Sequence, residues 1–290
     1  MTIAKTRTAP ARQSIVYVYG VARVAPGQTS GPLRLAGIVP GAPVEPLVSG
    51  NLMAFVSAVP STRFGASEFR SALNDAPWLR ERILAHEKVL EELRAGYDVV
   101  PFRFGTIYLD CAQASKAIAR YRAELCQALD RIEGACEWGL KLYCDPHILR
   151  RRIETESAGV RLMRDALAQA SPGARFFLQK KYTKALTEEM ATVVAGCVRR
   201  MRESFRTCAR DAADIKLQPA VVHGRAAEMA MNAAYLVAKR AFSRFQQTVA
   251  DWQKKYAAYG FDHELTGPWP PYHFVSIGSE GTADAAPPDR

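Results

Sequence analysis

The stretch Ile15-Val16-Tyr17-Val18-Tyr19-Gly20-Val21 (IVYVYGV) decides the fold of the first half of the chain. It is rich in β-branched and aromatic residues and carries no charge. A run of this kind is typical of a central strand that is covered on both faces. Shorter strand patterns follow at 35–39, 44–47 and 52–58, separated by turn sequences. The first half is therefore predicted to contain a sheet with residues 15–21 at its centre.

A helix is predicted to begin after Asp75, because aspartate caps free amides and Pro77 is tolerated in a first turn. Apolar residues then recur at steps of four and three positions and place His86 within an apolar stripe. A single histidine in such a stripe is more often a packed, hydrogen-bonded core residue than a ligand or a base. We therefore predict a structural role for His86.

Residues 99–109 are predicted to form one long strand that contains a single charge, Arg103, between Phe102 and Phe104. A guanidinium in that position must lie at an edge or meet a carboxylate, and Glu87 on the preceding helix is the expected partner. The pattern favours a structural pair of Arg103 with Glu87, because the polar companions of a catalytic or phosphate-binding arginine are missing from the sequence.

The order of predicted elements changes from Glu137 onward. It comprises a strand at 138–144, a helical region at 146–211 broken near 170–173, strands at 215–222 and 229–237, a helix at 239–259, and a strand-like segment at 261–277. This βαββαβ order is that of a ferredoxin-like domain, in which two helices cover one face of a four-stranded antiparallel sheet.

We therefore predict an α+β fold of two domains. An N-terminal α/β sheet domain spans 14–137, and a ferredoxin-like C-terminal domain with long helices spans 138–277. Residues 1–13 are polar and basic, and residues 278–290 are rich in Gly, Ala and Pro, so both are predicted to be disordered tails.

Composition limits the classes of partner and compartment. The chain has 39 Lys plus Arg against 29 Asp plus Glu, a formal net charge of +10 that suits nucleic acid, acidic lipid or acidic protein partners. Its six cysteines show neither a C-x-x-C pair nor the histidine spacing of a zinc site, so free thiols in a reducing compartment are predicted. No apolar segment has the length of a transmembrane helix. We expect a cytoplasmic protein without metal, cofactor or membrane span.

The motifs of the common enzyme classes are missing: the sequence has no phosphate loop, dinucleotide loop, nucleophile elbow or H-E-x-x-H pair. The predicted strands at 215–222 and 229–237 carry almost no aromatic surface on which unpaired bases would stack, so nucleic acid is not the expected partner. A non-enzymatic protein is the favoured interpretation. A ferredoxin-like RNA-binding or regulatory module is the alternative, and an undetected enzyme ranks third.

The segment TGPWPPYHF at 266–274 combines three prolines with three aromatic residues. Because proline has no amide hydrogen, Pro268, Pro270 and Pro271 confine the segment to a sheet edge or a bulge. Trp269 and Tyr272 then either pack onto the core or offer amphipathic surface to a partner. Such an edge can hold a selected protein, so these five residues form the candidate partner-binding segment.

Five regions form a combination that is specific when taken in order: Tyr17–Val21, Asp75–Leu79 with Ala85–Leu90, Val100–Thr106, Glu137–Lys141 and Thr266–Val275. Together they resemble the GvpF/GvpL family of gas vesicle proteins. Phe176–Lys181 is a looser match to a basic helix segment of that family.

The resemblance implies a two-domain α/β protein with a ferredoxin-like second domain and no catalytic residues. It further implies a cytoplasmic or vesicle-associated protein that serves gas vesicle formation. Such a protein would bind the small hydrophobic shell protein GvpA, limit its aggregation and meet other gas vesicle accessory proteins.

Overall fold

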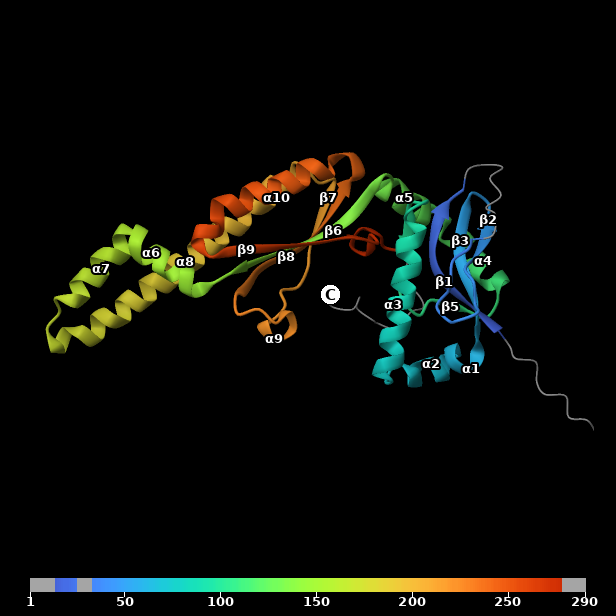
Figure 1. Ribbon diagram of the computed structural model, residues 1–290, viewed down its shortest axis with the longest axis horizontal. Coiled ribbons are helices and arrows are strands. Elements are labelled where there is room, and N and C mark those ends of the chain that lie inside the picture. Colours follow the sequence, from blue (N-terminus) through green and yellow to red (C-terminus); the bar gives the residue numbers. More distant parts are fainter. Residues whose placement is uncertain (1–13, 25–32, 278–290) are drawn as a thin grey trace, which may run out of the picture. The chain divides into compact units, whose positions relative to one another are not determined.

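The computed structural model describes residues 14–24 and 33–277, which form two compact units (Figure 1). Of the described residues, unit 1 comprises 14–24, 33–133 and 270–277, and unit 2 comprises Gly134–Trp269. The predicted tails at 1–13 and 278–290 lie outside the described residues. The sequence pattern placed the start of the second domain at 138 and its end at 277, whereas in the structure the chain leaves unit 2 after Trp269 and rejoins unit 1.

The sheet of unit 1 is built around β1 (Ser14–Arg23). On one side β1 pairs with β3 (Leu52–Pro60), which in turn pairs with β2 (Glu45–Ser49). On the other side it pairs with β4 (Val99–Pro101) and β5 (Ile107–Tyr108). All eight interior residues of β1 are buried, which confirms the prediction of a central strand covered on both faces.

Helices cover both faces of this sheet (Figure 1). The short helices α1 (Ser61–Phe64) and α2 (Ala66–Ala72) lead to α3 (Ala76–Leu93), which packs on one face. On the other face lie α4 (Cys111–Arg120) and α5 (Arg122–Ile132). Helix α3 begins where the sequence predicted, because the Asp75 carboxylate accepts a hydrogen bond from the Trp78 amide at 3.2 Å.

The prediction of one strand over 99–109 is wrong, because residues 102–106 form a loop between β4 and β5. The pairings of β4 and β5 with β1 differ in register by three residues. A turn closed by the Thr106 hydroxyl on the Arg103 carbonyl (2.7 Å) accommodates the extra residues, and Gly105 adopts φ +85° there. The predicted strand at 35–39 is reduced to an isolated bridge between Ala36 and Pro43.

Unit 2 contains an antiparallel sheet in the order β7-β8-β6-β9. Its strands are β6 (Ala135–Cys144), β7 (Asp211–Asp214), β8 (Glu228–Ala238) and β9 (Phe261–Trp269). The helices after β6 are α6 (Pro146–Glu156), α7 (Ala158–Ala168) and α8 (Pro172–Arg206). Those after β8 are η1 (Lys239–Ala241), α10 (Phe242–Tyr256) and η2 (Ala257–Tyr259). With α8 and α10 on one face (Figure 1), this is the predicted ferredoxin-like arrangement, and the α+β fold class is confirmed.

Two predicted strands of unit 2 have different bounds in the structure. The strand expected at 215–222 is wrong, since β7 comprises Asp211–Asp214 and the ladder ends where the Ile215 amide donates to the Asn232 carbonyl at 2.9 Å. Residues 216–227, here called the strap, leave the sheet and contain the short helix α9 (Ala220–His223). The last strand ends at Trp269 instead of 277, because Pro270 and Pro271 have no amide to continue the ladder, and η3 (Tyr272–Phe274) follows.

The aromatic centre of unit 2 contains a buried tyrosine. The rings of Phe205, Tyr235 and Phe245 lie with centroids 5.0–5.6 Å apart, and all three side chains are almost fully buried. Burial raises the pKa of Tyr235 from 10.0 to about 12, because the phenolate is poorly solvated in this apolar cluster.

This shift predicts a loss of stability at alkaline pH. The folded-state pKa exceeds the unfolded value, so the contribution is intact below pH 10 and disappears as the pH rises through 12. Between pH 8 and pH 11 we expect Tyr235 alone to lower the free energy of unfolding by about 1.4 kcal/mol. Urea titrations at both pH values should therefore show a smaller loss for Tyr235→Phe than for the wild type. An identical pH dependence in the two proteins would contradict the assignment.

Candidate functional site

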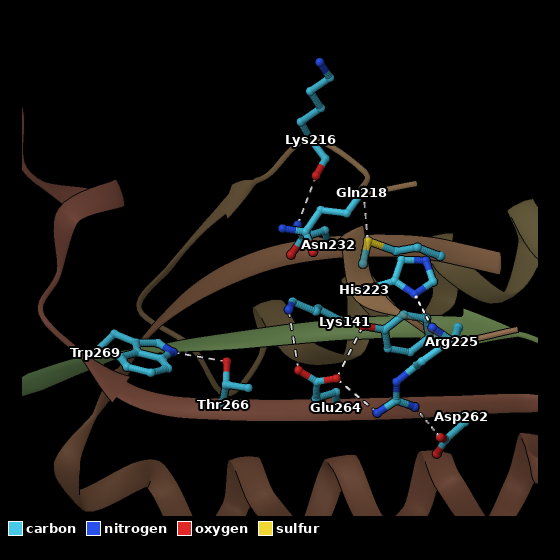
Figure 2. Close-up of polar contacts among 12 residues, drawn as sticks. Lys141, Lys216, Gln218, His223, Arg225, Asn232, Asp262, Glu264, Thr266 and Trp269 are labelled. Carbon is cyan, nitrogen blue, oxygen red and sulfur yellow. Dashed lines mark hydrogen bonds and ion pairs between the residues drawn. The ribbon is translucent and has the colours of Figure 1, made fainter. Parts of the chain in front are cut away.

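The first half of the candidate partner-binding segment belongs to the edge strand β9. Pro268 lies in β9, which pairs with no strand but β6 among the described residues, and it lies opposite a register shift between Glu137 and Gly139. Gly267 adopts φ +121°, and a Cβ there would lie 3.0 Å from the Glu137 carbonyl oxygen. The Trp269 indole donates to the Thr266 hydroxyl at 3.1 Å, as Figure 2 shows. A strand tolerates proline where it lies at the edge of a sheet or where its register with the neighbouring strand is irregular, and Pro268 meets both conditions.

The second half of the segment lies in unit 1. Pro270, Pro271 and Phe274 are buried, and Tyr272 packs against the apolar core formed by β1, β3 and α3. The Tyr272 hydroxyl lies 3.1 Å from His86 Nε2 and donates to Glu87 Oε1 at 3.1 Å. This half of the segment therefore helps to build the interior of unit 1.

His86 is the centre of a buried hydrogen-bond chain. Its side chain is fully buried, and its Nδ1 lies 2.9 Å from the Tyr17 hydroxyl. The Tyr17 hydroxyl accepts from the Gly105 amide at 3.1 Å, and Tyr272 donates to Glu87. A neutral imidazole with its proton on Nε2 satisfies this order: Tyr17 donates to Nδ1, and Nε2 donates to Tyr272.

Burial keeps the Tyr17 hydroxyl of this hydrogen-bond chain protonated. Burial raises the pKa of Tyr17 well above its ordinary value, with smaller contributions from Tyr19 and Glu87, while the Gly105 amide lowers it. The Tyr19 ring stacks on His86 with centroids 5.7 Å apart, and its hydroxyl donates to Ser57 at 2.9 Å. Tyr17 therefore remains a neutral donor, and His86 has a polar partner on each ring nitrogen.

The predicted ion pair of Arg103 with Glu87 does not form in the described part of the chain. The Arg103 side chain is exposed on the loop between β4 and β5, while Glu87 accepts from Tyr272. The predicted pairing depends on a continuous strand at 99–109, which would hold the Arg103 guanidinium between the sheet and α3. The loop at 102–106 replaces that strand, so the guanidinium is not held there. Arg103 contributes its carbonyl, which accepts from Thr106.

Other groups that could support chemistry are spread through the fold. Among the described residues, no three histidine, cysteine, aspartate or glutamate side chains are grouped so as to hold a metal ion. Burial raises the pKa of Cys144 to about 12 and that of Cys197 to about 11, which keeps both thiols protonated and weakly nucleophilic. In the same part of the chain, no helix has the length and apolarity to cross a bilayer.

The strap, which contains α9, lies on the face of the unit 2 sheet opposite α8 and α10 (Figure 1), and Figure 2 shows its polar contacts. The Arg225 guanidinium donates to Asp262 at 2.9 Å and to Glu264 at 3.0 Å, and it lies over the Tyr143 ring at 4.3 Å. Asn232 donates to the Lys216 carbonyl at 3.0 Å. Ferredoxin-like RNA-binding modules stack bases on this face of the sheet, so the strap occupies the surface that the alternative function would use.

Large apolar side chains remain exposed at two places in unit 2. On the strap they are Leu217, Val221 and Val222, and on the hairpin formed by α7 and the start of α8 they are Leu162, Met163, Phe176 and Phe177. Sequence reasoning missed the hairpin as a functional surface. The sequence pattern did not distinguish the exposed adjacent pair Phe176-Phe177 from a buried adjacent pair such as Val89-Leu90 of α3, because both read as apolar helix positions.

The hydrogen bonds of Tyr272 yield a stability prediction. Tyr272→Phe should lower the free energy of unfolding by about 1–2 kcal/mol, because a buried nitrogen of His86 loses a polar partner while the ring remains. Arg103→Ala is the matched control and should change it by no more than about 0.5 kcal/mol, since the side chain is exposed. Thermal and urea unfolding measure both effects. The geometry would be contradicted if Tyr272→Phe left the free energy of unfolding unchanged, or if Arg103→Ala lowered it substantially.

Sequence comparison finds related proteins that match almost the whole described chain. Residues 15–276 match the family model described as gas vesicle synthesis protein GvpL/GvpF. Gas vesicle protein L of Streptomyces sp. (strain CB03234) is 28% identical over 264 residues, covering 91% of this chain and 94% of that protein. Gas vesicle protein F of the same strain is 27% identical over 264 residues, covering 89% and 98%.

Solved structures show the same architecture. The crystal structure of GvpF from Anabaena sp. PCC7120 has a TM-score of 0.70 at 18% identity and covers 91% of this chain and 99% of that one. GvpF from Microcystis aeruginosa has a TM-score of 0.62 at 17% identity and covers 90% and 99%. Since the family model matches nearly the whole folded chain, this protein belongs to the GvpL/GvpF family of gas vesicle synthesis proteins.

Proposed function

We propose that this chain assists gas vesicle assembly by binding the hydrophobic shell protein GvpA and limiting its aggregation before it enters the shell. The family described above supports the role in gas vesicle synthesis. The observation that carries the proposal is the set of exposed apolar side chains on unit 2, which are attached to a fold that has a complete core of its own.

The physical basis is mass action between two apolar surfaces. A shell subunit with a face turned toward gas aggregates in water through that face and through open strand edges. A stable protein that covers such a face lowers the concentration of the free, aggregating species without consuming a nucleotide. The net charge of +10 favours encounter with acidic surface on GvpA or on other gas vesicle accessory proteins.

A non-catalytic role also fits the groups with chemical potential. His86 has a hydrogen-bonding partner at each ring nitrogen, and the buried thiols of Cys144 and Cys197 are held protonated. These side chains belong to the interior of their units, so we propose that the protein acts through contacts made by its surface.

Aggregation of purified GvpA diluted from denaturant tests the proposal. Light scattering should fall as the ratio of this protein to GvpA approaches one, with no nucleotide added, because each bound subunit is removed from the aggregating pool. An unrelated folded protein at the same concentration is the control. Unchanged scattering at equal stoichiometry would contradict the proposal, as would retention of nuclease-sensitive RNA in place of GvpA during affinity capture.

A further inference from the structure

The hairpin tip, defined as residues 158–187 of α7 and α8, is an exposed part of unit 2 (Figure 1). The side chains of Leu162, Phe176 and Phe177 are 71%, 72% and 68% exposed, and Met163 is exposed beside them. The hairpin is anchored by Val160, Tyr182 and Leu186, which belong to the core of unit 2. The anchored residues fix the two helices, so the apolar residues beyond them are held in place on the surface.

Basic side chains outnumber acidic ones in the hairpin tip. The tip carries six basic side chains and one acidic side chain, Asp165; the basic ones are Arg161, Arg164, Arg175, Lys180, Lys181 and Lys184. Arg164 pairs with Asp165, and Lys184 pairs with Glu188 just beyond the tip. Within the described residues, Arg161, Arg175, Lys180 and Lys181 take part in no ion pair. These four cations are available to a partner.

We propose that the hairpin tip is a docking surface for an acidic amphipathic helix of a partner protein. The apolar stripe of such a helix would cover Phe176, Phe177 and Leu162, and its carboxylates would meet the lysines and arginines of the tip. The proposal deepens the function proposed above by naming the surface and the chemistry of the bound segment, and it rests on that function for the identity of the partner.

The shape of the tip favours a helix over an extended strand. The tip consists of two helices joined by Gln169–Ser171 and offers no strand edge to which an extended segment could add. Charge complementarity selects an acidic partner and makes association sensitive to salt, because exposed charges are screened over about 8 Å at physiological ionic strength.

Binding of a fluorescent helical peptide with a leucine stripe and glutamate flanks tests the docking surface. A peptide with lysine in place of glutamate is the partner control. The wild type should bind the acidic peptide, more weakly at high salt, and should not bind the basic one. Phe176→Ser with Phe177→Ser, and separately Lys180→Glu with Lys181→Glu, should weaken binding at least about tenfold.

Matched variants control for each change. Leu109 is 67% exposed in unit 1, so Leu109→Ser removes a comparable apolar side chain elsewhere. Lys254→Glu with Lys255→Glu reverses two adjacent exposed lysines on α10. Both controls should bind the acidic peptide as the wild type does. Circular dichroism verifies folding, and the charge-reversal pair keeps the test valid if the serine variant unfolds.

Several results would overturn the docking surface. Two of them are peptide results: the tip variants bind the acidic peptide as tightly as the wild type does, or the wild type binds neither peptide. The other two name a different occupant: the wild type floats with phosphatidylserine vesicles in a way that depends on Phe176 and Phe177, or it forms a dimer that the serine variant abolishes. The same variants in the GvpA scattering assay separate the two proposals. Equal protection by wild type and tip variants would refute the tip alone, whereas peptide binding without protection of GvpA would refute the proposed function alone.

Discussion

A buried imidazole needs a polar partner at each nitrogen. In unit 1 this requirement is met by hydrogen bonds that join three separate segments of the chain. His86 on α3 meets Tyr17 on β1 on one side and Tyr272 near the end of the described chain on the other. The contact with Tyr272 joins residues 186 positions apart and explains why the chain returns to unit 1 after β9. The prolines at 270 and 271 end the ladder of unit 2, and η3 then places the tyrosine against α3.

The polar groups around His86 in unit 1 are paired, whereas large apolar side chains on unit 2 remain uncovered, as in a protein that binds a partner. Inside unit 1 the hydrogen-bonding groups of Tyr17, His86 and Tyr272 have partners. On unit 2, by contrast, Phe176 and Phe177 expose most of their area to solvent. Leaving such area uncovered forgoes the stabilisation that burial would give, roughly 1.5–3 kcal/mol for each phenylalanine side chain. A partner that covers these side chains recovers part of that free energy, since association also costs translational, rotational and side-chain entropy.

Local sequence signals predicted much of the fold. Asp75 caps α3 as predicted, and the uncharged run at 15–21 is the buried central strand. The order of strands and helices gave the ferredoxin-like unit, since each element has its own periodicity. The loop at 102–106 was missed because its flanking residues have the same β-forming composition as the strands. The return of Tyr272 depends on a contact distant in sequence, which no local pattern contains. The exposure of Phe176 was missed because periodicity marks an apolar residue without showing whether another element covers it.

Together, the two proposals predict that GvpA contacts the apolar surface of the hairpin tip. Photo-crosslinking measures this contact directly, with benzoylphenylalanine placed at position 176 in one variant and at the similarly exposed position 109 in another. We expect a crosslink to GvpA from position 176 and none from position 109. Crosslinking from neither position, or to the same extent from both, would contradict it.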